Sequence, residues 1–150
     1  MWIKGARPRT LPAAIAPVAV GTACVSVEAN ATANWSNAIL ALIVSLALQV
    51  AVNYANDYSD GVRGTDDKRV GPLRLVGSGA KTASAVKRAA FLSFGVAAIF
   101  GLILALLTSL WLLVVGVLCI LAGWFYTGGK KPYGYFGLGE VFVFVFFGVV

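Results

Sequence analysis

Apolar positions in this chain come in long blocks, separated by short polar segments. Four blocks are close to the length of about 20 helical residues that crosses a bilayer. They cover residues 11–28, 38–56, 89–108 and 110–126. A fifth block begins near residue 136 and continues to residue 150. The pattern predicts an all-α integral membrane protein, a transmembrane helix bundle with four complete spans and the start of a fifth.

Two local features shape these predicted spans. Pro12 and Pro17 lie in the first block, so we expect a bent or late-starting helix there. Only Ser109 separates the third and fourth blocks, which predicts a very tight hairpin between them.

Composition agrees with lipid as the solvent. Of 150 residues, 59% are hydrophobic and only 12% are charged, whereas soluble domains carry about 25% charged residues. Histidine is absent, which excludes a histidine general base, a histidine haem ligand and imidazole-built zinc or copper sites. Cys24 and Cys119 each lie inside an apolar block and are interpreted as small hydrophobic residues. Because no cleavage pattern follows the basic start, we expect the first span to be retained.

The basic residues all fall on one side of the predicted spans. They are Lys4, Arg7, Arg9, Arg63, Lys68, Arg69, Arg74, Lys81, Lys87, Arg88, Lys130 and Lys131. The positive-inside rule places this side, with the N-terminus, in the cytoplasm of a multi-pass protein of the cell inner (plasma) membrane. The isoelectric point near 9.6 follows from the same bias. Nucleic acid is therefore not an expected partner.

One stretch departs from the apolar pattern: LQVAVNYANDYSDGVRGTDDKRVGPLR, residues 48–74, which holds four of the six acidic residues. Gln49, Asn53, Asn56, Asp57 and Asp60 recur at the spacing of one helical face. Polar groups inside a membrane block need partners and usually mark function. For Gln49 the alternative is an interhelical amide hydrogen bond.

Carboxylates that converge at a membrane surface repel one another unless a cation lies between them. Oxygen ligands favour Mg²⁺ or Ca²⁺, and the absence of histidine and suitable cysteine removes softer metals. Mg²⁺ is typically held by a few carboxylates plus substrate phosphate oxygens. The basic residues between Arg63 and Lys81 supply the cations of a phosphate site. The alternative is a solvated loop whose charges merely follow the positive-inside rule.

A second polar segment lies on the same side: GWFYTGGKKPYGYFGLGE, residues 123–140. We expect it to bring cations and phenols toward the aspartate loop from Tyr126, Lys130, Lys131, Tyr133 and Tyr135. An interfacial aromatic belt with positive-inside lysines is the alternative.

At these residues the chain resembles a known family. NDYSD is similar to the first aspartate-rich motif, N-D-x-x-D-x-x-x-D, of the UbiA superfamily of intramembrane aromatic prenyltransferases. Asn56, Asp57 and Asp60 match, while the next aspartate, Asp66, comes two residues later than in the general pattern. The longer NDYSDGVRGTDD, with GPLR, SG and YGYFGLGE after it, resembles the 1,4-dihydroxy-2-naphthoate branch of menaquinone biosynthesis. The resemblance covers essentially the whole chain.

The resemblance implies a helical bundle with a cytoplasm-facing cavity, in which Mg²⁺ holds the diphosphate of a polyprenyl diphosphate. The metal would stabilise the departing diphosphate, and the ring of 1,4-dihydroxy-2-naphthoate would capture the allylic cation. The prenyl tail would lie among the helices of the lipid-embedded bundle.

The candidate site residues follow from this resemblance together with the polar face and the basic loops. The expected metal ligands are Asn56, Asp57, Asp60 and Asp66. The candidate catalytic residues are Asn53, Asp57 and Asp60, and the candidate substrate-binding residues are Arg63, Arg74, Tyr126 and Lys131.

Two other function classes remain open at this point. DYSDG also fits the D-x-x-D-G start of a CDP-alcohol phosphotransferase motif, but no aspartate follows Asp67 to continue it. A non-enzymatic cation channel or transporter could use an acidic ring at its mouth. Such a protein would usually carry further acidic residues deeper in its spans.

The family uses a second aspartate-rich loop, and Glu140 is the only acidic residue after Asp67. The chain also stops inside an apolar run whose backbone needs a complete helix in lipid. We therefore expect residues 1–150 to be the N-terminal part of a single transmembrane domain. The natural protein should be roughly twice as long, with the second motif in a later cytoplasmic loop.

Overall fold

The computed structural model describes residues 1–28, 32–65 and 73–149, and within these ranges all regular secondary structure is helical. The elements in chain order are α1 (Trp2–Gly5), η1 (Pro8–Thr10), α2 (Pro12–Val27), α3 (Trp35–Arg63), α4 (Ala83–Leu107), α5 (Trp111–Phe125), η2 (Tyr133–Phe136), α6 (Gly139–Val143) and the π-helix η3 (Phe144–Val149). The predicted all-α fold is confirmed.

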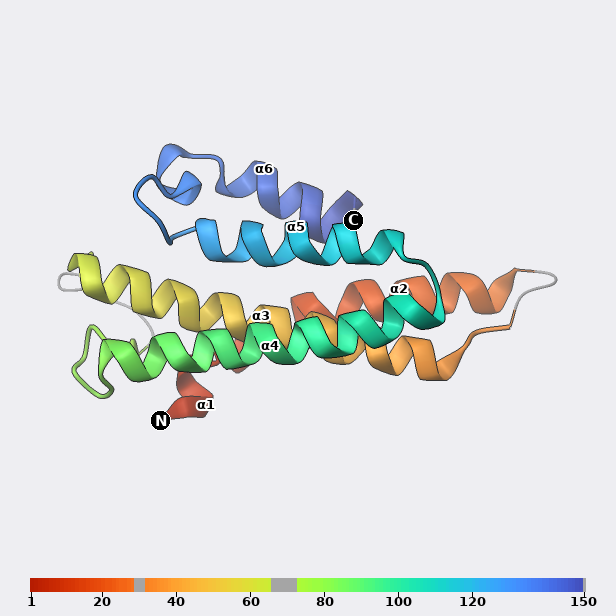
Figure 1. Ribbon diagram of the computed structural model, residues 1–150, viewed down its shortest axis with the longest axis horizontal. Helices are drawn as coiled ribbons and strands as arrows, with labels where there is room; N and C mark the ends of the chain where they lie inside the picture. The colour runs from red at the N-terminus through yellow and green to blue at the C-terminus, as the bar shows by residue number, and fades with distance from the viewer. Residues whose placement is uncertain (29–31, 66–72, 150) are drawn as a thin grey trace.

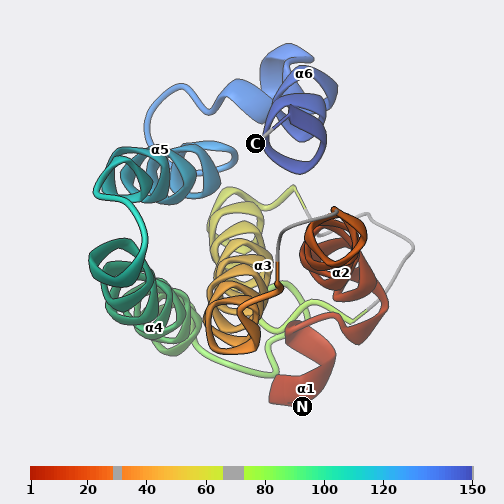
Figure 2. The same cartoon turned by 90° about the vertical axis from the view of Figure 1, so that its right-hand side faces the viewer.

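Helix α3 forms the middle of the bundle. Figure 2 shows it surrounded by α2, α4 and α5, and Figure 1 shows these four helices lying along the long axis of the molecule. Helix α3 packs along α4 and α2, while α5 contacts both α3 and α4. The three residues between α4 and α5, 108–110, form the tight hairpin that the sequence predicts.

Local sequence signals set the ends of the two longest helices. The Asn34 side chain caps α3 by accepting a hydrogen bond from the Asn37 N–H (3.1 Å). Gly64, in the left-handed conformation with φ 71°, ends the same helix. Thr82 caps α4 through the Ala85 N–H (3.4 Å). Helix α3 therefore continues seven residues beyond the predicted span and carries the polar stretch in helical form.

Only two helices, α3 and α4, are by themselves long and apolar enough to cross a membrane within the described ranges. Helix α2 has 16 residues and α5 has 15. At 1.5 Å per residue, α5 is about 22 Å long, shorter than a hydrocarbon core of about 30 Å. The segment Trp2–Thr10 and α2 reach the required length together, but the chain bends by 48° between them. The bend thus lies at the very start of the first block, just before Pro12, while Pro17 lies inside the continuous helix α2. Four complete spans are not confirmed.

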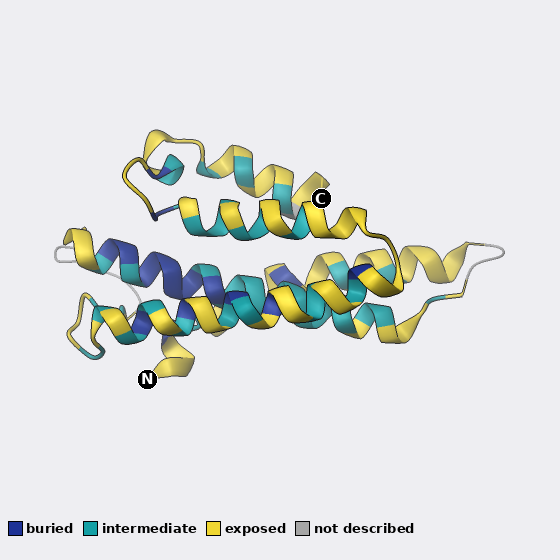
Figure 3. Cartoon of the chain, in the orientation of Figure 1, coloured by how far each residue is buried: buried dark blue, intermediate teal, exposed yellow. Residues whose placement is uncertain are grey.

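The buried core lies where α3 meets α4 and the start of the chain. Its members are Ala51, Tyr54, Ala55, Leu75, Val86, Ala90 and Phe94. Elsewhere the helices turn large apolar side chains outward, with Leu106 67% and Ile99 61% exposed. Exposed apolar surface of this extent suits contact with lipid. Figure 3 shows the buried stretch concentrated toward the C-terminal end of α3.

The segments that carry the basic residues lie toward the same end of the bundle. These segments are the end of α3, the start of α4, the connection from α5 to η2, and the N-terminal region with α1 (Figure 1). Lys68 and Arg69 lie outside the described residues. The cytoplasmic assignment of this end stays a prediction from charge.

Candidate active site

The last third of α3 buries polar side chains. Asn53, Asn56, Asp57 and Asp60 are 3%, 9%, 0% and 7% exposed. Buried polar groups are unfavourable unless they are hydrogen-bonded. Each of these side chains has a partner from a different part of the chain, so this end of α3 organises the segments around it.

A polar pocket of about 220 Å³ lies against this part of α3. Its lining comes from the N-terminal segment, from α3, from the segment before α4, and from the connection between α5 and α6. The lining residues are Arg7, Asn56, Asp60, Arg74, Tyr126, Thr127, Gly134 and Tyr135. Two predicted metal ligands, Asn56 and Asp60, and two predicted substrate-binding residues, Arg74 and Tyr126, are thus brought together.

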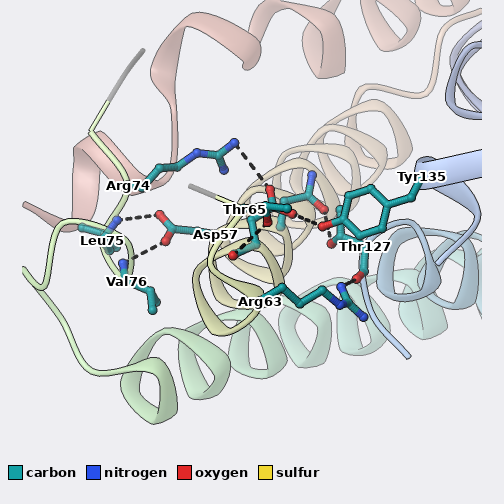
Figure 4. Close-up of polar contacts among 10 residues, drawn as sticks. Asp57, Arg63, Thr65, Arg74, Leu75, Val76, Thr127 and Tyr135 are labelled. Carbon is teal, nitrogen blue, oxygen red and sulfur yellow. Dashed lines mark hydrogen bonds and ion pairs between the residues drawn. The ribbon is translucent and has the colours of Figure 1, made fainter. Parts of the chain in front are cut away.

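Asp60 is contacted through both of its carboxylate oxygens. The Tyr135 hydroxyl donates a hydrogen bond to Oδ1, and Arg74 Nη2 lies 3.6 Å from Oδ2 in an ion pair whose side chains are 12% and 10% exposed. The Asp60 backbone carbonyl also accepts a hydrogen bond from the Thr65 hydroxyl (3.0 Å). Figure 4 shows Arg74 and Tyr135 approaching from opposite sides. This arrangement places one carboxylate between a guanidinium and a phenol.

Asn56 faces the same pocket one helical turn earlier. Its Oδ1 accepts a hydrogen bond from the Thr127 hydroxyl (2.8 Å). Next to Thr127, the Tyr126 ring packs edge-on against Tyr133 with ring centroids 5.5 Å apart. Gly134 allows this packing, because a Cβ there would lie 2.6 Å from the Tyr126 carbonyl oxygen. A pair of oxygens four residues apart on α3 therefore points into one cavity.

Asp57 points away from the pocket. Its Oδ2 accepts a hydrogen bond from the Leu75 N–H (2.8 Å) and its Oδ1 accepts one from the Val76 N–H (3.0 Å), as Figure 4 shows. The structure thus places Asp57 against the backbone of the segment before α4. Its predicted part in metal binding stays a prediction.

The amides of Asn53 and Gln49 hold the N-terminal segment instead of lining the pocket. Asn53 Nδ2 donates hydrogen bonds to the Ala6 carbonyl (2.8 Å) and the Thr10 hydroxyl (2.9 Å), and Gln49 Nε2 donates to the same hydroxyl (3.2 Å). The interhelical hydrogen bond considered for the Gln49 amide is confirmed, and its partner is Thr10 of η1. Asn53, a candidate catalytic residue, positions the segment that carries Arg7.

The remaining predicted residues lie outside the pocket. Arg63 donates hydrogen bonds to the carbonyls of Thr127 and Gly129, and its guanidinium lies 5.4 Å from the centroid of the Tyr135 ring. Arg63 therefore holds the connection between α5 and α6, which carries four lining residues. Lys131 is exposed on that connection and is not part of the lining. Asp66 lies outside the described residues.

Two tyrosines between α5 and α6 have pKa values above the ordinary value of a phenol. Burial, together with the hydrogen bond to Asp60, raises the pKa of Tyr135 above its ordinary value. Burial, with a smaller effect of Tyr126, raises the pKa of Tyr133 to about 12. Both phenols donate hydrogen bonds, Tyr133 to the Ala122 carbonyl (2.7 Å) and Tyr135 to the Asp60 carboxylate.

Three lining side chains were absent from the predicted site residues: Arg7, Thr127 and Tyr135. Tyr135 was expected to approach the aspartate loop, and the structure confirms that contact. Thr127 had a weak signal, since it is the one hydroxyl between Tyr126 and the glycines that follow. In the sequence, Arg7 contributes only to the positive charge that predicts the membrane orientation. Its left-handed backbone, with φ 52°, could not be foreseen for a residue other than glycine.

Comparisons with known proteins identify the family. The UbiA prenyltransferase family matches residues 14–150. The chain belongs to this family. That membership confirms the resemblance drawn from Asn56, Asp57 and Asp60, and it favours a prenyltransferase over the phosphotransferase and transporter interpretations.

Several curated relatives carry the name 1,4-dihydroxy-2-naphthoate octaprenyltransferase. The protein of this name from Mycobacterium tuberculosis is 58% identical over 149 residues, which is 99% of this chain and 50% of the relative. The Escherichia coli protein is 40% identical over 160 residues, covering 98% of this chain and 49% of its own. The chain thus spans about half the length of these relatives. No solved structure matches it.

Proposed function

We propose that the protein takes part in the Mg²⁺-dependent transfer of a polyprenyl group from polyprenyl diphosphate to 1,4-dihydroxy-2-naphthoate in menaquinone biosynthesis. Membership in the UbiA prenyltransferase family and the names of the relatives support this proposal. The observation that carries it is the polar pocket, which combines a carboxylate, an amide oxygen, two guanidinium groups and two phenols. These groups suit a metal-bound diphosphate.

The donor set at the pocket fits Mg²⁺. Asp60 and Asn56 offer a carboxylate and an amide oxygen on one face of α3, and Mg²⁺ commonly takes one or two protein carboxylates and completes its shell with water and substrate phosphate. Among the described residues no group of three or more acidic or cysteine side chains lies together. We assign Asp60 and Asn56 as ligands because both line the pocket, with Asp66 as the third ligand that the family motif implies. When bound, Mg²⁺ would neutralise charge on the diphosphate and stabilise it as a leaving group.

The two arginines of the pocket would hold the diphosphate. A prenyl diphosphate carries about three negative charges, and removing it from water requires several countercharges. Arg74 lines the pocket beside Asp60, so its guanidinium is placed to bind a phosphate oxygen. Arg7 lines the same pocket from the N-terminal segment. Asn53 holds the backbone next to Arg7 by donating a hydrogen bond to the Ala6 carbonyl. Arg63 holds the backbone of Thr127 by donating a hydrogen bond to its carbonyl.

The reaction itself breaks the allylic C–O bond of the donor, whose electron pair leaves with the diphosphate. A ring carbon of the naphthoate uses a π electron pair to form the new C–C bond. The group on that carbon, a proton or the carboxylate as CO₂, then departs and returns its bonding electrons to the ring. The phenols of Tyr126 and Tyr135 would face the developing charges from the pocket wall. The prenyl tail would extend among the apolar helices. With the basic end in the cytoplasm, both substrates would enter from that side of the plasma membrane.

A transfer assay tests this function. We would use a hybrid in which this chain replaces the matching half of the Mycobacterium tuberculosis relative, reconstituted in liposomes with labelled polyprenyl diphosphate. The expected result is a lipid-soluble adduct that requires both Mg²⁺ and 1,4-dihydroxy-2-naphthoate. Asp60→Asn should abolish its formation. Glu28→Gln, which makes the same chemical change at an exposed acid on the far end of α2, should not.

The outcomes separate the assignments. Product formation at an unchanged rate in Asp60→Asn would overturn the role of this carboxylate. A folded hybrid that releases no diphosphate with any aromatic acceptor would overturn the transferase proposal. The 150-residue chain alone, assayed in parallel, is expected to bind donor weakly and form no product.

A further inference from the structure

Asp57 is the most completely buried acidic side chain that the structure describes, at 0% exposed. Each of its two oxygens accepts one backbone N–H, from Leu75 at 2.8 Å and from Val76 at 3.0 Å. Hydrogen bonds from neutral donors to an ionised carboxylate are stronger than neutral pairs. They also satisfy a charge that would otherwise be costly to bury. Both oxygens of the Asp57 carboxylate are therefore used to bind the backbone of another segment of the chain, which we call the anchored segment.

The anchored segment, residues 73–81, is seated by packing as well. Leu75 is fully buried among the core residues of α3 and α4. Val76 lies directly against Gly61, where a Cβ would come within 2.5 Å of its side chain. The segment closes on itself through Lys81 N–H to the Leu75 carbonyl (2.8 Å) and Gly79 N–H to the Val76 carbonyl (2.9 Å). It thus meets α3 as a compact turn.

Arg74 immediately precedes the two anchored amides. Its guanidinium reaches Asp60, three residues after Asp57 on the same helix, at 3.6 Å. In Figure 4 the backbone of Leu75 and Val76 is fixed by Asp57, while the Arg74 side chain extends from this fixed point toward the pocket. The place of the guanidinium therefore depends on where the turn is attached.

We propose that Asp57 is a positioning residue that attaches the 73–81 turn to α3 and thereby holds Arg74 at the polar pocket. Asp57 and Asp60 then have separate tasks, because Asp57 sets the backbone of the turn and Asp60 faces the ligand. The proposal rests on the proposed function only for the identity of the anion that Arg74 binds. The attachment itself needs neither metal nor substrate.

Two measurements on the full chain in lipid nanodiscs, with EDTA and without substrate, test the proposal. Hydrogen exchange reports the Leu75 and Val76 amides, and phenylglyoxal labelling followed by mass spectrometry reports the accessibility of Arg74. Asp57→Asn retains one acceptor oxygen but turns an NH₂ group toward the second amide. Exchange at these amides should rise about tenfold or more, and Arg74 should be labelled faster.

Asp60→Asn is the matched control. It removes the ion pair with Arg74 and leaves the attachment of the turn in place, so Arg74 labelling should rise while exchange at Leu75 and Val76 stays unchanged. If Asp57 served only as a metal ligand, Asp57→Asn would leave both measurements at the wild-type values in EDTA, and the proposal would be overturned. Failure of the transfer assay would overturn the proposed function without touching this result.

A second variant covers the case in which Asp57→Asn does not fold. Gly61→Ala keeps the carboxylate and pushes Val76 away from it. Faster exchange at Val76 accompanied by faster labelling of Arg74 would support the dependence of Arg74 on the attachment. Faster exchange with unchanged labelling would show that Arg74 is held independently, and would overturn the proposal.

Discussion

Replacement of Gly61 by alanine is the sharpest test of how the turn before α4 packs on α3. A Cβ at this position would lie 2.5 Å from both Cβ and Cγ1 of Val76 and 3.3 Å from the Gly77 nitrogen. Carbon atoms in contact are normally about 3.5–4.0 Å apart, so the turn must shift by about 1 Å. Because Val76 Cβ is fixed to its backbone, a side-chain rotation cannot provide that shift.

Two effects of opposite sign decide the result. Alanine in a helix interior is favoured over glycine by about 1 kcal/mol, and overpacking typically costs about 1–3 kcal/mol. Gly95 of α4 is the matched control, since within the described part of the chain no atom lies within 4 Å of a Cβ placed there. Gly95→Ala should keep only the helical gain. We expect Gly61→Ala to be less stable than Gly95→Ala by about 1–3 kcal/mol.

The assay combines reversible unfolding in detergent micelles with hydrogen exchange. A shift of about 1 Å would lengthen the 3.0 Å contact from the Val76 N–H to Asp57 beyond hydrogen-bonding range, so this amide should exchange faster in Gly61→Ala and not in Gly95→Ala. Adding Val76→Gly removes the clashing Cβ and should restore the helical gain, which a double-mutant cycle measures. Equal stabilisation by both alanines, with unchanged exchange at Val76, would refute the packing.

Two further predictions concern topology and alkaline stability. In a cysteine-free background, Asn34→Cys should react with a membrane-impermeant maleimide on intact cells. Arg63→Cys and Lys130→Cys should react only after the cells are lysed. Labelling of Arg63→Cys but not of Asn34→Cys on intact cells would contradict the predicted orientation. Burial, with a smaller effect of Tyr126, raises the pKa of Tyr133 to about 12 from 10.0, so the stability contributed by its neutral form is complete below about pH 10 and is lost as the pH rises toward 12. Tyrosinate absorbance should show a late-titrating group that is missing in Tyr133→Phe, and titration of that group near pH 10 would contradict the assignment.

The helical fold and the polar face of α3 could be predicted because they depend on residues near one another in sequence. Apolar block length predicts helices, and the spacing from Gln49 to Asp60 places five polar side chains on one helix whatever surrounds it. The capping residues Asn34 and Thr82 act within three residues. The number of spans did not follow from the apolar blocks, because blocks 11–28 and 110–126 are themselves shorter than the roughly 20 residues that cross a bilayer, and α2 and α5 are shorter still, with 16 and 15 residues.

The partners of the polar side chains were decided only by the tertiary structure. Asp60 meets Tyr135 from 75 residues away and Asn56 meets Thr127 from 71 residues away, and no local periodicity encodes contacts of that separation. Asp57 and Asp60 look equivalent in the motif, yet one is buried under a turn and the other faces a pocket. The difference arises because packing of Leu75 and Val76 on α3 brings two backbone donors to Asp57, and a buried carboxylate takes the donors nearest to it. Sequence thus determines which side chains α3 presents, and long-range packing determines which of them remain available to a ligand.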